Sequence, residues 1–154
     1  MMFMPDTNRF LPFFRTSFQD LVHLRMTLEL GCAERAIKNV TDEDIKQLHA
    51  LCEKIQSLGS YPDEKSKCIV NDADMEFHTK IMKLSKNTLI NSLIPLVVEF
   101  FAQQFRKSAA SPIESTSGYH EHFEMVDALK HKNLYQLITL IRSHLNTYME
   151  TYNT

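Results

Sequence analysis

Glycine and proline are scarce in this sequence, which contains three and five of them among 154 residues. With so few glycines there is no glycine-rich loop of the kind that binds phosphate, so nucleotide binding has no support. The alternation of apolar and polar residues that marks strands is also missing, because apolar residues recur at intervals of three and four. The sequence therefore predicts helices throughout and argues against folds built from strands and hairpins.

A surplus of positive charge is missing as well. Lysine and arginine together number 17, against 19 aspartate and glutamate residues, which gives a formal net charge of -2. Contact with the phosphate backbone of DNA requires a basic surface. We therefore do not expect this chain to bind DNA by itself.

Paired cysteines, a secretory signal and a long hydrophobic run are absent too. Cys32, Cys52 and Cys68 are odd in number and form no CxxC motif, which indicates reduced thiols in a reducing compartment. The apolar start at residues 1–5 is too short for a signal peptide, and the apolar stretch 89–105 is too short between its polar flanks for a membrane span. These features predict a cytoplasmic protein with no membrane segment.

The residues that are present fit one all-α domain. A hydrophobic fraction of 44% and a charged fraction of 23% are ordinary for a globular protein, and a chain of this length fits a single core. Helix caps, apolar stripes and breaks predict an antiparallel bundle of six helices, or seven if Pro95 or the polar loop at 108–118 divides one. The helices are expected at residues 17–38, 41–59, 64–85, 89–105, 120–129 and 134–149.

The first 17 residues are expected to form an N-terminal arm or linker, because a proline interrupts an aromatic segment there and regular structure starts only at Ser17. Residues 18–154 then make up the helical domain. The aromatic side chains of the arm are expected to cover either the domain itself or a partner: Phe10, Phe13 and Phe14.

Two metal-capable side chains stand four residues apart in the predicted helix 64–85. Asp74 and His78 lie one helical turn apart on the same face, with Cβ atoms about 5–6 Å from each other. One helix therefore offers two ligands, although an Asp–His pair at this spacing also occurs as an ordinary surface pair.

His122 and His144 are placed symmetrically about Asn133, in the turn that joins the last two predicted helices. Eleven residues on each side, at about 1.5 Å per residue, put both histidines roughly 16 Å from the turn on neighbouring antiparallel helices. Asp74 and His78 lie at a comparable depth on their own helix. The spacing thus predicts that four side chains from three helices converge, with scattered surface histidines as the alternative.

Imidazole and carboxylate groups suit a borderline divalent ion, here Zn, Ni, Mn or Co. Ligation would also remove the desolvation cost of unpartnered histidines inside an apolar bundle. A tetrahedral structural site and an octahedral site with two positions for water or a carboxylate both remain open. The other histidines are expected at the surface or behind the ligands, without contact to the metal: His23, His49, His120 and His131.

Four short patterns follow one another along the chain. They are Asp20-Leu21 with Leu24-Arg25-x-x-Leu28-Glu29, then Asp74-x-x-Phe77-His78 with Ser85-Lys86-Asn87, then Glu121-His122 with Asp127-Ala128-Leu129, and last Ser143-His144-Leu145. Each pattern is weak alone, but the ordered set is specific. From Asp20 to Tyr148 it resembles the FCD effector-binding domain of GntR-family bacterial transcription regulators.

The resemblance implies that a small organic acid binds on or beside a divalent metal, in a domain that pairs as a homodimer. It also implies that Arg25 faces the effector, where a guanidinium suits a carboxylate in a bidentate manner. The alternative for Arg25 is an i,i+4 pair with Glu29 on its own helix. The implied metal ligands are Asp74, His78, His122 and His144.

The chain departs from the family's pattern at its start. Regulators of this family begin with a winged helix-turn-helix domain, and residues 1–17 leave no room for one, so we expect that domain to be absent from this chain. The expected function is therefore that of the ligand-sensing and dimerisation domain of a regulator, which contacts DNA only through the absent domain.

The residues leave two other functions open. A structural, metal-stabilised helical interaction module would need only a closed metal site. A metal-dependent hydrolase would need a general base near the metal, but Glu76 and Glu121 are spaced off the face of the ligands, and no Glu-x-x-His pairs occur. We therefore expect a sensor and not an enzyme.

Overall fold

Six α-helices make up the computed structural model, which describes residues 17–61, 63–107 and 117–151. No strand occurs in these ranges, so the predicted all-α class and the count of six helices are confirmed. The helices are α1 (Phe18–Asn39), α2 (Asp42–Gly59), α3 (Glu64–Lys83), α4 (Thr88–Lys107), α5 (Ser117–Lys130) and α6 (Leu134–Thr151). The N-terminal arm predicted at 1–17 lies outside the described residues except for Ser17.

Short polar side chains fix where the first three helices begin. Ser17 accepts a hydrogen bond from the backbone N–H of Asp20, and Asp63 accepts one from Ser66. Thr41 and Asp44 form a reciprocal capping box at the start of α2. Each contact satisfies a backbone N–H that has no partner within the first helical turn.

Pro95 does not divide the apolar helix as the sequence allowed. α4 runs without a break from Thr88 to Lys107 with Pro95 inside it. Proline removes one backbone donor and leaves the carbonyl of Asn91 without its helical partner. Because both Pro95 and Asn91 are exposed, water can satisfy that carbonyl, and the helix continues. Most of the loop predicted at 108–118 lies outside the described residues, and α5 takes in its last two positions.

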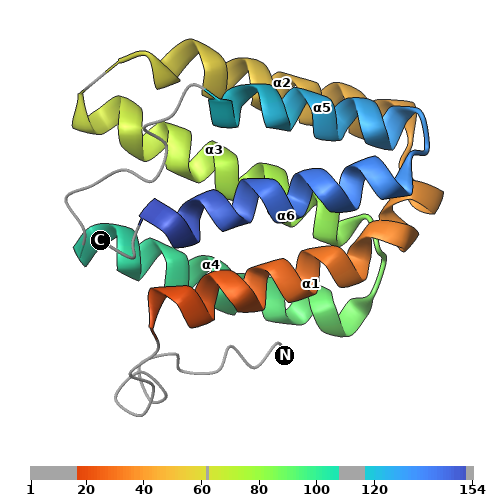
Figure 1. Cartoon of the computed structure of the whole chain (residues 1–154), viewed down its shortest axis with the longest axis horizontal. Helices are drawn as coiled ribbons and strands as arrows, with labels where there is room; N and C mark the ends of the chain where they lie inside the picture. The colour runs from red at the N-terminus through yellow and green to blue at the C-terminus, as the bar shows by residue number, and fades with distance from the viewer. Residues whose placement is uncertain (1–16, 62, 108–116, 152–154) are drawn as a thin grey trace, which may run out of the picture.

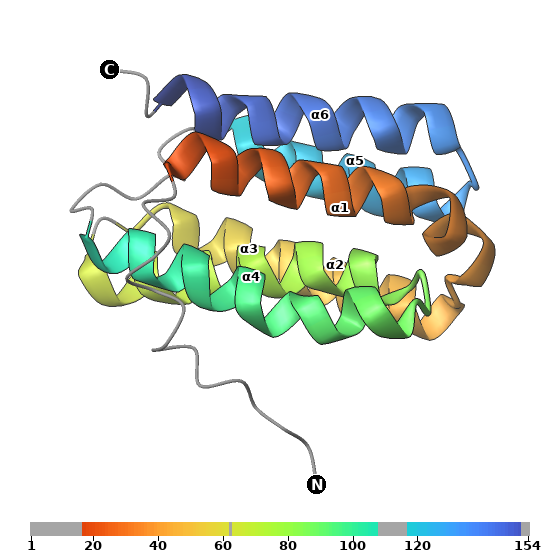
Figure 2. The same cartoon turned by 90° about the horizontal axis from the view of Figure 1, so that it is seen from below.

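The helices form two layers of three. Figures 1 and 2 show α5, α6 and α1 side by side in one layer and α2, α3 and α4 in the other, with consecutive helices running in opposite directions. Between the layers, α3 packs on α1, and α2 packs on α5. The antiparallel hairpin of α5 and α6 therefore lies level with the middle of α3.

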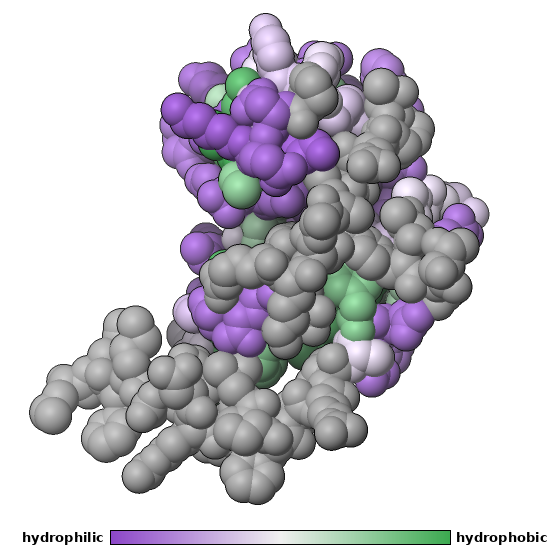
Figure 3. All heavy atoms as spheres, turned by 90° about the vertical axis from the view of Figure 1, so that its left-hand side faces the viewer, coloured by the Kyte–Doolittle hydropathy of each residue, from purple (hydrophilic) through white to green (hydrophobic). Residues whose placement is uncertain are grey.

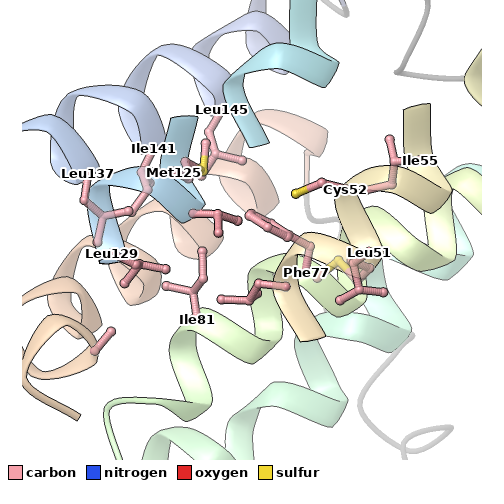
Figure 4. Close-up of a cluster of buried hydrophobic side chains, with 14 of the residues drawn as sticks. Leu51, Cys52, Ile55, Phe77, Ile81, Met125, Leu129, Leu137, Ile141 and Leu145 are labelled. Atoms are coloured by element: carbon pink, nitrogen blue, oxygen red, sulfur yellow. The ribbon is translucent and has the colours of Figure 1, made fainter. Parts of the chain in front are cut away.

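Apolar side chains from both layers fill the space between them. Figure 4 shows part of this core, in which Phe77 and Ile81 of α3 face residues of α5 and α6. The described atoms at the end of the bundle where α1 begins are mostly hydrophilic, with hydrophobic ones showing in small areas (Figure 3). Within the described ranges, no helix combines the length and hydropathy that a membrane span requires.

Candidate metal centre

Polar side chains interrupt the apolar core at one place, where α3, α5 and α6 meet. Asp74 and His78 come from α3, His122 from α5 and His144 from α6, and all four are buried. One ligand atom from each lies within 4.8 Å of every other. The structure thus brings together the four side chains that the sequence singled out, at the depth expected from their distance to the turn.

The Oδ1 atom of Asp74 is the centre of this cluster. His122 Nε2 lies 2.8 Å from it, and the Nε2 atoms of His78 and His144 each lie 3.5 Å from it. The rings of His122 and His144 are 4.5 Å apart between centroids. Three imidazole nitrogens therefore surround one carboxylate oxygen.

Two further carboxylates contact the Nδ1 atoms of two of the histidine rings. Glu29 of α1 lies with Oε1 2.6 Å from Nδ1 of His78, and Glu121 of α5 lies with Oε2 2.8 Å from Nδ1 of His144. The Nε2 atoms of both rings are buried and have no hydrogen-bond partner among the described residues. A carboxylate on one ring nitrogen, with the other nitrogen directed to a common point, is the arrangement of metal-binding histidines.

Two residues of the other layer, on α1 and α6, donate hydrogen bonds to the second carboxylate oxygen of Asp74. The hydroxyl of Tyr148 donates to Oδ2 at 2.9 Å, and Nη2 of Arg25 donates to the same oxygen at 3.4 Å. With Oδ2 held by these two donors, Oδ1 is directed toward the histidines. Tyr148 lies four residues after His144 on α6 and so shares its face.

Arg25 is completely buried beside the cluster, with Cζ 5.2 Å from the ring centroid of Phe101 and 5.6 Å from that of Tyr148. Its Nε lies 4.0 Å from Glu29, so the local pair on α1 is present but long. Both Nε and Nη1 lack a hydrogen-bond partner among the described residues. Buried guanidinium donors without acceptors are costly, and an incoming carboxylate would satisfy them.

Asp74 is held in its charged form. Burial alone would raise the pKa of this carboxyl, but electrostatic interactions with His78 and Arg25, with the hydrogen bond from His122, hold the pKa well below its usual range. An ionised carboxylate inside an apolar core needs compensating cations. The lowered pKa means that Asp74 offers a charged carboxylate to a ligand at neutral pH.

The pKa values of His122 and His144, on α5 and α6, are shifted in opposite directions. Burial lowers the pKa of His122 to about 4, although the contact with Asp74 opposes this. Burial would also lower the pKa of His144, but its contacts with Asp74 and Glu121 outweigh burial and raise the pKa. At neutral pH His122 is thus a free base, the form in which imidazole binds metals.

The residues present fit a divalent metal. Metal–nitrogen and metal–oxygen bonds of about 2.0–2.2 Å place donor atoms about 3–4 Å apart, close to the spread of the four donors here. The buried, unpartnered Nε2 atoms of His78 and His144 also gain a partner in this way. Three imidazoles and one carboxylate suit Zn, Ni, Mn or Co.

Sequence reasoning missed three residues of the site. The sequence pattern indicates Glu29 only as a partner of Arg25, and it gives no role to Tyr148. Glu121 was expected to point away from the ligands, and its side chain does so on α5 but reaches His144 on the adjacent α6. As expected, the histidines outside the cluster are exposed: His23, His49, His120 and His131.

Comparisons with known proteins identify one family and a shared fold. The family model described as the FCD domain matches residues 20–147. A structure of E. coli McbR/YncC is similar, with a TM-score of 0.70 and 18% identity, covering 90% of this chain and 71% of that chain. A structure of Streptococcus agalactiae GntR has a TM-score of 0.68 and 23% identity, covering 97% of this chain and 62% of that chain. At these identities the two structures show a shared fold. No curated protein sequence matches the chain.

Proposed function

This chain belongs to the FCD domain family, and from that premise we propose that it is the ligand-sensing and dimerisation domain of a cytoplasmic GntR-family transcription regulator. In this proposal the domain binds a divalent metal and a small organic acid. The acid controls DNA binding by a winged helix-turn-helix domain outside the matched region. The chain spans less than two thirds of the S. agalactiae GntR structure, which leaves room for such a domain in that protein.

One observation carries the proposal: a buried cluster of one aspartate and three histidines lies beside a buried arginine with unpartnered donors. The cluster alone would fit a structural metal site. The unpartnered Nε and Nη1 atoms of Arg25 favour a second, anionic ligand, because each buried N–H lacks an acceptor that a carboxylate oxygen can supply.

Each residue of the site has a separate task in binding. A bound divalent metal would supply Lewis acidity and positions for oxygen ligands. Asp74 contributes a charged ligand whose direction Tyr148 fixes, while Glu29 and Glu121 orient two of the imidazoles. Arg25 receives the carboxylate of the acid from the opposite side.

Sensing requires that the acid bind one arrangement of the domain more tightly than another. The site joins α1 to α3 through Arg25 and Asp74, and to α6 through Tyr148. A carboxylate on Arg25 would compete with Asp74 for the guanidinium and so change how α1 packs. In a homodimer, this shift would alter the spacing of the two DNA-binding domains.

A hydrolase finds little support at this site. Glu76, on the same helix as Asp74, is exposed, and Glu121 is engaged by His144 and Ser143. Neither carboxylate is free to act as a general base toward a water between the histidines. Catalysis would need a base from elsewhere in the chain.

The test combines metal analysis with calorimetry. Protein purified without added metal is expected to contain one divalent ion per chain, and titration with acetate is expected to give saturable binding without turnover. Replacing both His122 and His144 with alanine should abolish both properties. The matched control replaces the exposed His120 and His131 and should change neither. Metal binding without binding of any carboxylic acid would favour a structural module, and an unchanged metal content in the first variant would refute the site.

A further inference from the structure

A groove of about 300 Å³ opens between α3 and α4, outside the metal-binding cluster. Its walls are mostly apolar, and its volume lies at the lower limit of cavities that hold small organic ligands. The side chains that form its floor and walls include Asn71, Met75, Thr79, Val98, Phe101 and Ala102.

Only one side chain separates this groove from Arg25. Phe101 lines the groove and is itself buried, and the guanidinium of Arg25 stacks at 5.2 Å from the centroid of the same ring. On the opposite wall, Met75 lines the groove and directly follows Asp74 in α3. A turn of the Phe101 side chain would therefore connect the groove to the unpartnered donors of Arg25.

Acidic side chains stand at the rim of the groove. Asp72 and Glu76 both line it and are both exposed. Together they give the outer end of the groove a negative potential, which opposes a second carboxylate on any ligand whose first carboxylate lies inside. The groove thus accepts an apolar body and disfavours an anionic far end.

We propose that the α3–α4 groove is the outer compartment of the effector site and that it selects monocarboxylic acids with an apolar body over short acids and over dicarboxylic acids. This inference rests on the proposed function, because it takes Arg25 as the receptor of the carboxylate. An effector must displace the Phe101 side chain to reach Arg25 from the groove. The apolar body then occupies the groove between Met75 and Val98.

Calorimetric titration of the metal-loaded protein with acetate, hexanoate and adipate tests the proposal. Each methylene transferred from water into the groove gives about a fourfold gain in affinity. We therefore expect hexanoate to bind at least about tenfold more tightly than acetate. Adipate has the same length as hexanoate but ends in a second carboxylate, and it should lose this gain.

Variants of the groove separate its contribution from that of the inner site. Ala102→Phe fills the groove and should remove the advantage of hexanoate while acetate binds as before. The control is Leu89→Phe on the same helix, because Leu89 is 70% exposed and lies outside the groove. A second variant that avoids any packing change is the double substitution Asp72→Asn with Glu76→Gln, which should raise the affinity for adipate alone.

The outcomes distinguish this inference from the function on which it rests. If acetate binds but hexanoate binds no more tightly, or if Ala102→Phe weakens both acids equally, the groove is not part of the effector site and the sensor proposal stands. If none of the three acids binds, both proposals fail. Hexanoate binding that Ala102→Phe reduces to the level of acetate supports the groove.

Discussion

Glu29 shows at the level of a single residue how the site is organised. Its side chain is fully buried, with Oε1 2.6 Å from Nδ1 of His78 and Oε2 4.0 Å from Nε of Arg25. The shorter contact fixes the tautomer of His78, because Nδ1 must carry the proton that Oε1 accepts. The Nε2 atom is then left with a lone pair directed at the cluster.

Glu29→Gln should therefore weaken metal binding without removing a ligand. An amide is a poorer acceptor than a carboxylate and can present its NH₂ group to His78, which disturbs the tautomer and the ring orientation. Losses of about 10- to 100-fold in metal affinity are usual for such substitutions. Competition with a chromophoric chelator measures the change.

Glu34→Gln is the matched control for this experiment. Glu34 lies on the same helix but is exposed and pairs only with Lys38, at 3.0 Å. Its substitution should leave the metal affinity unchanged. Equal affinities in Glu29→Gln and in the unsubstituted protein would show that Glu29 does not position His78.

The sequence could predict the residues of the cluster because their spacing obeys helical geometry. Asp74 and His78 share a face by their four-residue interval, and His122 and His144 are equidistant from a turn. The partner of His78 could not be found in this way, since Glu29 is 49 residues distant and has Arg25 four residues before it as an obvious local partner. The same helical spacing predicts that Tyr148 shares the face of His144, because it stands four residues after it.

At the level of the helix, capping decides where α2 begins and couples it to α3. Asp44 accepts hydrogen bonds from the backbone and the hydroxyl of Thr41, and Lys80 of α3 donates to it at 3.2 Å. Partial burial would raise the pKa of Asp44, but the hydrogen bonds from Thr41 and Lys80 lower it. The folded state therefore favours the ionised carboxylate.

Asp44→Asn should reduce stability at neutral pH and have less effect in acid. The lowered pKa means that Asp44 stabilises the fold above its unfolded pKa of about 4, and that this contribution is lost as the pH falls through the folded value. Urea unfolding should show a decrease in the free energy of unfolding on the order of 1 kcal/mol at pH 7. This decrease should become smaller toward pH 3. Asp42→Asn, an exposed acid in the same turn, should show neither the loss nor its pH dependence.

Two of the helical glycines, Gly31 and Gly59, have opposite effects on stability. A Cβ at Gly59 would overlap the ring and hydroxyl of Tyr119, which donates to the Gly59 carbonyl at 3.0 Å, whereas a Cβ at Gly31 would meet nothing within 4 Å. Gly59→Ala should therefore destabilise the protein by about 1–3 kcal/mol. Gly31→Ala should stabilise it by up to about 1 kcal/mol, because alanine favours helix. Thermal unfolding of both variants measures the contrast, and similar shifts would contradict it.

The helices themselves were predictable because their caps and apolar stripes are local. The helix ends predicted at Ser17, Thr41 and Gly59 lie within one residue of the ends in the structure. Pro95 was the exception, since proline alone does not reveal whether the freed carbonyl faces water or the core. The close approach of Tyr119 to Gly59 joins residues 60 positions apart and has no local signal.

For the whole molecule, the candidate metal centre joins both layers of the bundle. Its proposed ligands come from α3 in one layer and from α5 and α6 in the other, and Glu29 adds α1. Most of the core between the layers is apolar, so the only buried ionic contacts among the described residues are concentrated here. A ligand that binds this point in the folded state alone stabilises all four helices at once.

Metal loading should therefore raise the temperature of global unfolding. At a free metal concentration of about 100 times Kd the stabilisation is about 2.7 kcal/mol, which corresponds to about 5–10 °C for a domain of this size. Differential scanning fluorimetry with Zn²⁺, Ni²⁺ or Mn²⁺, and again after addition of a chelator, measures the shift and its reversal. His144→Ala should lose the shift, and the exposed His131→Ala should keep it. An equal shift in both variants would mean that the metal binds elsewhere, because His144 is the proposed metal ligand from α6 and His131 is not part of the cluster.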